Sequence, residues 1–272
     1  MPTIELAASP HAPGIRPVTI HYREYGSGEP LIFLHSGWGY GVYPFEKQIK
    51  AFEGQFRILI PDRSGYGHST PVTGEMSLDF HWRAAAETAA FLDQLGIGKA
   101  IVWGHSDGAV IAAILGINDP QRCACLILEA LHFLKRKPGS RSFFERFAAR
   151  PEELGEQTRH LLVEDHGEEY WRSVIRRNCE VWIRMAGSVR GPEDDVYEGR
   201  LSELAVPTLC VHGRCDPRTE PGEMERVGEA LPRTAIRFIE NGRHSPHSEE
   251  AASEECSDLA QEFWSALDGS TR

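Results

Sequence analysis

The chain has 272 residues, of which 41% are hydrophobic and 25% are charged, a composition typical of a soluble globular protein. Its net charge is −11 and its longest basic cluster is Lys135, Arg136 and Lys137, so nucleic acid is not an expected partner, because binding it requires cationic side chains that neutralise phosphates. No run approaches the roughly 20 apolar residues that cross a bilayer, and the first 17 residues lack the pattern of a signal peptide; we expect a cytoplasmic protein with no membrane partner.

Short apolar runs alternate with longer helical patterns, which predicts a mostly parallel sheet whose strands are joined by helices. In chain order, the predicted strands cover residues 18–25, 31–34, 57–60, 100–103, 125–128, 208–211 and 236–239. Most are four or five residues long and bounded by Gly or Pro, as expected of strands buried on both faces. The predicted helices cover residues 45–52, 78–96, 109–116, 223–231 and 253–267.

Residues 132–200 interrupt this alternation with helical, aromatic-bearing sequence that contains no predicted strand. We predict that they form a helical cap inserted into a core domain made of residues 1–131 and 201–272. Phe143, Trp171 and Trp182 are candidates for lining a substrate pocket under the cap. Any one of these aromatic residues can equally serve to pack the cap onto the core.

Residues 104–108 read Gly-His-Ser-Asp-Gly and lie between a predicted strand and a predicted helix. In that position the Gly-x-Ser-x-Gly pattern is typical of a nucleophile elbow, a strained turn that exposes a reactive serine. Glycines are needed because the residues two before and two after the serine approach too closely for Cβ atoms. Ser106 is therefore the predicted nucleophile.

A nucleophilic serine needs a general base, and the base needs an acid that orients it. Asp216 follows one predicted strand and His244 follows the next, so both should reach the sheet edge where α/β proteins build their sites. We predict Asp216 as the acid and His244 as the base. His247, in the same loop, is the alternative base, whereas His212 is expected to be a core residue.

Negative charge that develops on the substrate oxygen requires backbone N–H donors, which form an oxyanion hole. We expect one donor from Asp107 and the other from the loop after strand 31–34, with Gly37 preferred over Trp38. The carboxylate of Asp107 has two interpretations. It can attract an amine on the substrate and so belong to the pocket, or it can simply favour the dipole of the helix that begins there.

Five motifs in this order resemble the α/β-hydrolase superfamily over nearly the whole chain. They are His-Ser-Gly at residues 35–37, where the family usually has His-Gly-x, the turn at 62–69, the elbow at 104–108, the acid turn at 213–216 and the histidine loop at 241–247. The elbow and the chain length are also similar to the valacyclovir-hydrolase-like branch. The resemblance implies an α/β-hydrolase fold, with a mostly parallel central sheet of about eight strands flanked by helices and a helical cap insertion.

The predicted function is hydrolysis of a small carboxylic ester, thioester or lactone through an acyl-enzyme, with a small-molecule acyl substrate as the partner. Hydrolysis of a carbon–carbon bond in a diketone-type ring-cleavage product stays open, because this fold supports it with the same residue set. A non-catalytic binding protein on the same scaffold also stays open. The six cysteines have no zinc-binding spacing, and neither a metal nor an organic cofactor is expected.

Overall fold

The computed structural model describes residues 1–191 and 194–270. Its eight strands form one sheet in the order β1-β2-β4-β3-β5-β6-β7-β8. Only β1 and β2 run antiparallel to their neighbours, and the other pairs are parallel. The strands are β1 (Thr3–Leu6), β2 (Val18–Tyr25), β3 (Glu29–Leu34), β4 (Phe56–Pro61), β5 (Ala100–His105), β6 (Cys123–Glu129), β7 (Thr208–Gly213) and β8 (Ala235–Ile239).

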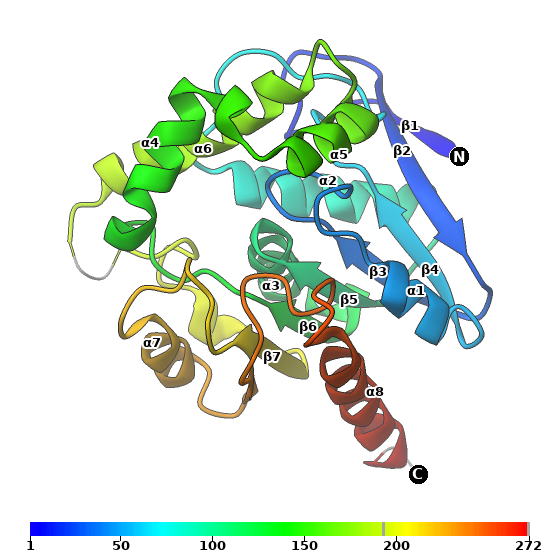
Figure 1. Ribbon diagram of the computed structural model, residues 1–272. Helices are drawn as coiled ribbons and strands as arrows, with labels where there is room; N and C mark the ends of the chain where they lie inside the picture. The colour runs from blue at the N-terminus through cyan, green and yellow to red at the C-terminus, as the bar shows by residue number, and fades with distance from the viewer. Residues whose placement is uncertain (192–193, 271–272) are drawn as a thin grey trace.

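Helices cover both faces of this sheet (Figure 1). They are α1 (Glu46–Phe52), α2 (Phe80–Gln94), α3 (Asp107–Asn118), α4 (Arg141–Ala149), α5 (Glu156–His166), α6 (Trp171–Ser188), α7 (Glu223–Ala230) and α8 (Ser253–Ser270). Helices α1 and α8 pack on one face, and α2, α3 and α7 pack on the other. The predicted fold class, an α/β-hydrolase fold with a mostly parallel sheet of about eight strands, is confirmed.

The central strand β5 illustrates why the sheet is buried on both sides. All six of its residues are buried. Ala100 and Val102 belong to the core cluster under α2 and α3, whereas Ile101 and Trp103 belong to the cluster under α1 and α8. Because successive side chains of a strand point to opposite faces, an uninterrupted apolar run serves two cores at once.

Strand β1 lies in a segment for which the sequence predicted no strand. It has a single buried residue, Leu6, and pairs with β2 along only four residues at the edge of the sheet. Ile4 and Leu6 alternate with polar residues and both pack on the core, but the run is only four residues long, the shortest in which this alternation predicts a strand.

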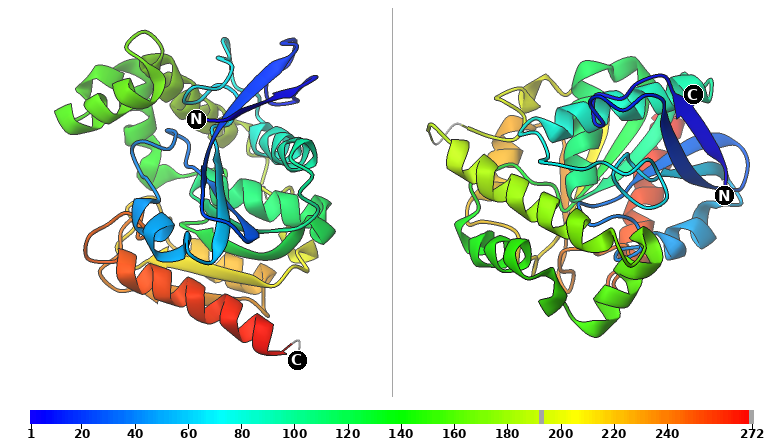
Figure 2. Two further views of the ribbon diagram at one scale, coloured as in Figure 1. Left: turned by 90° about the vertical axis from the view of Figure 1, so that its right-hand side faces the viewer. Right: turned by 90° about the horizontal axis from the view of Figure 1, so that it is seen from above.

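The described part of residues 132–200 contains α4, α5 and α6 and no strand. These helices lie together at one end of the molecule, on the side away from α8 (Figure 1, Figure 2). None of the described helices is both long and apolar enough to span a bilayer.

Candidate active site

Ser106 lies in the sharp turn between β5 and α3, with φ 55° and ψ −120°. A positive φ is strained for any residue with a Cβ atom, and such strain occurs where the surrounding structure holds it. Here the Ser106 N–H donates a hydrogen bond to the Glu129 carbonyl over 2.9 Å. A Cβ atom on Gly104 would collide with the Gly108 carbonyl, and one on Gly108 would collide with the Leu34 carbonyl. Both glycines are therefore required by close backbone packing.

The structure brings Ser106, His244 and Asp216 together at the carboxyl edge of the sheet. Oγ of Ser106 lies 3.1 Å from Nε2 of His244, and Nδ1 of His244 lies 2.9 Å from Oδ2 of Asp216. Burial alone would raise the pKa of Asp216, but the His244 imidazole and its hydrogen bond hold that pKa well below its usual range. An ionised Asp216 accepts the Nδ1–H of His244, which leaves the Nε2 lone pair free to accept the Ser106 proton.

The side chains of His247, His105 and His212 form no hydrogen bond with Ser106, although Nε2 of His212 lies 3.7 Å from Oδ2 of Asp216. His247, the alternative base, lies 2.8 Å from Glu129 through Nδ1 and 3.1 Å from the Tyr43 carbonyl through Nε2. His105 contacts the His244 carbonyl at 2.8 Å through Nε2, so it supports the loop that carries His244. His212 is buried, and its Nε2 lies 2.6 Å from Oγ1 of Thr219.

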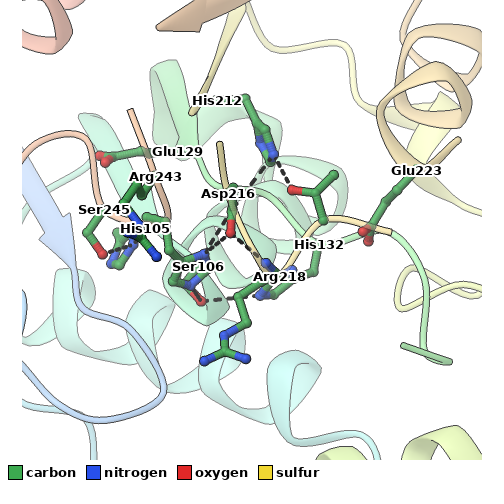
Figure 3. Close-up of polar contacts among 12 residues, drawn as sticks. His105, Ser106, Glu129, His132, His212, Asp216, Arg218, Glu223, Arg243 and Ser245 are labelled. Atoms are coloured by element: carbon green, nitrogen blue, oxygen red, sulfur yellow. Dashed lines mark hydrogen bonds and ion pairs between the residues drawn. The ribbon is translucent and has the colours of Figure 1, made fainter. Parts of the chain in front are cut away.

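His132 is a residue near the nucleophile that the sequence reasoning missed. Its Nε2 lies 3.3 Å from Oγ of Ser106 (Figure 3). Its ring is stacked on that of His244 with 5.6 Å between centroids. Burial, reinforced by the charge of Lys137, lowers the pKa of His132 well below its usual value, so the ring is neutral near pH 7. The signal that could have found it is its position, three residues after β6, at the same sheet edge as the elbow.

The loop after β3 is held against the site by Arg63. Its guanidinium donates to the carbonyls of His35 over 2.6 Å and of Ser36 over 2.8 Å. The Trp38 N–H donates to Oγ of Ser36 over 3.4 Å. In the described part of the chain, the N–H groups of Gly37 and Asp107 have no hydrogen-bond partner. These two are the donors that remain available to a ligand oxygen.

The Asp107 carboxylate is buried and accepts hydrogen bonds from two neighbouring elements. Nε2 of His81 on α2 lies 3.0 Å away, and on α6 Asn178 donates over 2.8 Å and Trp182 over 3.2 Å. Burial would raise the pKa of Asp107, but the His81 hydrogen bond and charge, with Asn178 and Arg63, lower it instead. The carboxylate therefore joins the elbow to α2 and α6.

A cavity of about 50 Å³ opens beside Ser106. It is lined by polar and aromatic side chains of the core and of α4 and α6, namely Ser36, Gly37, Trp38, Tyr43, Ser106, Asp107, His132, Phe143, Phe144, Asn178, Trp182, Arg218 and His244. The predicted pocket residues Asp107, Phe143 and Trp182 are among them.

Trp171 was also predicted to line the pocket, and the structure corrects that expectation. Trp171 packs in a separate apolar cluster with Phe147 and Leu162, and its outer side faces a surface hollow along α5. It is the first residue of α6, eleven residues before Trp182. Eleven residues make about three turns, so the two side chains lie on the same face of α6. They are about 16 Å apart along the helix at 1.5 Å per residue, and only Trp182 reaches the cavity.

A buried group of His105, Glu129 and His247 has the composition of a metal site, with candidate ligand atoms within 4.8 Å of one another. Glu129 also accepts a hydrogen bond from Nε1 of Trp103 over 2.9 Å and one from the His247 N–H over 2.9 Å. The Glu129 carboxylate thus has its hydrogen-bond partners within the protein. We interpret the group as a hydrogen-bond network that anchors the His244 loop to the end of β6.

Comparison with known proteins agrees with this architecture. A model of the alpha/beta hydrolase fold family matches residues 29–251. The chain is 25% identical to the human serine hydrolase BPHL over 90% of this chain and 83% of that protein. It is 31% identical to a pimeloyl-[acyl-carrier protein] methyl ester esterase of Vibrio campbellii, over 84% of this chain and 92% of that protein. A solved esterase from Thermogutta terrifontis superimposes with a TM-score of 0.71 at 19% identity, covering 98% and 99% of the two chains.

Proposed function

The chain belongs to the α/β-hydrolase fold family, and we propose that it is a serine esterase in which Ser106 is the nucleophile, His244 the general base and Asp216 the acid that orients the base. The observation that carries this proposal is the geometry of Ser106. Its strained turn projects Oγ to 3.1 Å from Nε2 of His244, whose Nδ1 lies 2.9 Å from Asp216. A serine hydroxyl becomes a useful nucleophile when a positioned imidazole can take its proton.

In the proposed reaction, His244 removes the Ser106 proton as Oγ attacks the carbonyl carbon of the ester. The N–H groups of Gly37 and Asp107 stabilise the resulting oxyanion, and α3 contributes the positive end of its dipole at the same point. The protonated His244 then gives its proton to the departing alcohol. Water, activated by His244, hydrolyses the acyl-enzyme, and Asp216 stays ionised throughout.

The cavity has a volume of only about 50 Å³, which favours a substrate with a small acyl group. A thioester or a lactone would pass through the same tetrahedral intermediate. The relative named as a methyl ester esterase also supports ester chemistry. Other curated relatives are named proline iminopeptidases, so family membership alone leaves the type of scissile bond open.

The test combines covalent labelling with a substrate panel. A fluorophosphonate probe should label the wild-type protein and leave the Ser106→Ala variant unlabelled. Short p-nitrophenyl esters should be hydrolysed at least a thousandfold faster by the wild type than by the variant, in line with the cost of removing such a nucleophile. Absence of Ser106-dependent labelling would favour a binding protein. Faster turnover of a ring-cleavage diketone than of every ester would favour carbon–carbon bond hydrolysis.

A further inference from the structure

Arg218 carries a positive charge into the cavity that lies beside Ser106. It follows Asp216 by two residues in the loop after β7 (Figure 3). It lines the cavity together with His132 and Phe143. Its backbone is held at both polar groups, because its N–H donates to Oδ1 of Asp216 over 2.8 Å and its carbonyl accepts from Nζ of Lys137 over 3.0 Å. These two contacts fix the backbone from which the side chain extends toward the cavity.

The guanidinium of Arg218 has no carboxylate partner among the side chains described for residues 1–191 and 194–267. Its carbon lies 3.2 Å from the centroid of the Phe143 ring, which covers one face of the group but accepts none of its hydrogen bonds. Partial burial lowers the pKa of Arg218, an effect that Tyr43 and Asp216 oppose. The group nevertheless remains cationic at neutral pH, because arginine is protonated throughout that range.

The other buried charges of this region are compensated. Lys137 lies 2.7 Å from both oxygens of Glu223. The Asp107 carboxylate already accepts hydrogen bonds from Asn178 and Trp182 and lies 3.0 Å from Nε2 of His81. An amine on the substrate would have to displace these partners, whereas an anion would meet the free donors of Arg218. The electrostatic character of the cavity therefore favours an acidic ligand.

We propose that Arg218 binds a carboxylate on the substrate, and that the enzyme acts on esters of small molecules that carry a second, free carboxylate. A guanidinium presents paired N–H donors that match the two oxygens of a carboxylate, and charge-assisted bonds of this kind are the strong ones. The aromatic walls formed by Trp38, Phe143 and Trp182 would enclose the short apolar spacer between the two groups. This inference rests on the proposed esterase function and specifies its substrate class.

The test compares p-nitrophenyl esters that differ in the group at the end of the acyl chain. The hemisuccinate carries a carboxylate, the 4-methylpentanoate replaces it by an isopropyl group of similar shape, and the 4-aminobutyrate carries an amine. A fourth substrate, 4-acetoxybenzoate set against phenyl acetate, places the carboxylate on the leaving group. In the wild type, kcat/KM should favour the carboxylate in at least one of the two pairs by on the order of tenfold or more.

Arg218→Gln should reduce that preference at least tenfold, mainly through KM, and Arg218→Lys should retain part of it. Arg214→Gln is the matched control, because Arg214 lies in the same loop, pairs with Glu240 on the surface and does not line the cavity. It should keep the wild-type preference. A wild-type preference for the uncharged ester in both pairs, a preference for the amine ester over the hemisuccinate, or equal losses in Arg218→Gln and Arg214→Gln would overturn the inference.

Calorimetry separates this inference from the esterase proposal, because it needs no turnover. Succinate should bind to the Ser106→Ala protein and bind at least tenfold more weakly when Arg218→Gln is added. Equal binding by the two proteins would overturn the carboxylate site even if Ser106 is labelled by the fluorophosphonate. Arg218-dependent binding by a protein whose wild type is not labelled would support the carboxylate site and contradict only the esterase.

Discussion

Nε2 of His132 lies 3.3 Å from Oγ of Ser106, almost as close as Nε2 of His244, which lies 3.1 Å from the same oxygen. The two imidazoles differ in their remaining contacts. His244 is joined to the Asp216 carboxylate through Nδ1, and no carboxylate in the described chain contacts His132. Because an oriented imidazole that can become cationic is the better general base, we assign the proton transfer to His244 and a supporting hydrogen bond to His132.

Substitution of the two histidines should therefore have unequal effects. His244→Ala should lower kcat by roughly 10⁴ or more, as removal of such a base does in other serine hydrolases. His132→Gln should lower kcat/KM by about tenfold or less, which corresponds to one hydrogen bond. His160→Gln, an exposed control on α5, should behave as wild type. Steady-state kinetics on one ester decides the matter, and equal losses at His132 and His244 would reject the assignment.

The elbow glycines should tolerate no side chain. Gly104→Ala would drive a Cβ atom into the Gly108 carbonyl, so the variant should lose about 3 kcal/mol or more of unfolding free energy or fail to accumulate as folded protein. Gly187→Ala is the control, because this exposed glycine of α6 has open space around it. It should gain about 0.5–1 kcal/mol through helix propensity. Urea unfolding measures both, and a Gly104→Ala protein as stable as the wild type would contradict the close approach of residues 104 and 108.

The buried ion pair of Lys137 and Glu223 should be important for stability. Both side chains are at most 2% exposed. Lys137→Met would leave the Glu223 carboxylate buried without its cation and should cost about 3–5 kcal/mol. Arg141→Met removes an exposed partner of Glu145 and should change stability by less than about 1 kcal/mol. Chemical denaturation compares the two, and similar small losses would show that Glu223 does not need Lys137.

Stability should fall as the pH drops from neutral toward 4. Burial lowers the pKa of His11 and of His105 from 6.5 to about 3 in the folded protein, whereas both regain their usual pKa on unfolding. Between these values the unfolded chain binds more protons, so the stabilisation is complete above pH 6.5 and is lost progressively as the pH falls toward 3. Each such histidine contributes a slope of about 1.4 kcal/mol per pH unit.

Urea titrations at pH 7, 5.5 and 4.5 measure this slope. The His11→Gln variant should show a shallower decline than the wild type over the same range, by up to one proton. His160→Gln, whose imidazole is exposed, should keep the wild-type slope. A decline that is identical in all three proteins would show that His11 is protonated in the folded state.

The amino-acid sequence by itself determined the features that depend on neighbouring residues. The elbow could be identified because a strand, a Gly-x-Ser-x-Gly turn and a helix are contiguous, and its strain and glycine packing are local to residues 104–108. The positions of Asp216 and His244 could be predicted because parallel strands end at one edge of the sheet, so the residue after each strand reaches that edge. The alternation of strands and helices indicated the fold class, because each strand and helix is recognised from the pattern of its own neighbouring residues.

Tertiary structure alone decided which side chains meet across distant segments. Asp107 is held by His81 from α2 and by Asn178 and Trp182 from α6, and no local pattern predicts how those helices pack. The same packing places His132 beside Ser106, directs Trp171 away from the cavity and leaves Arg218 without an ion-pair partner in the described chain. The physical reason is that periodicity specifies which face of a helix is apolar, whereas its position along and across its neighbours depends on how all the side chains fill space together.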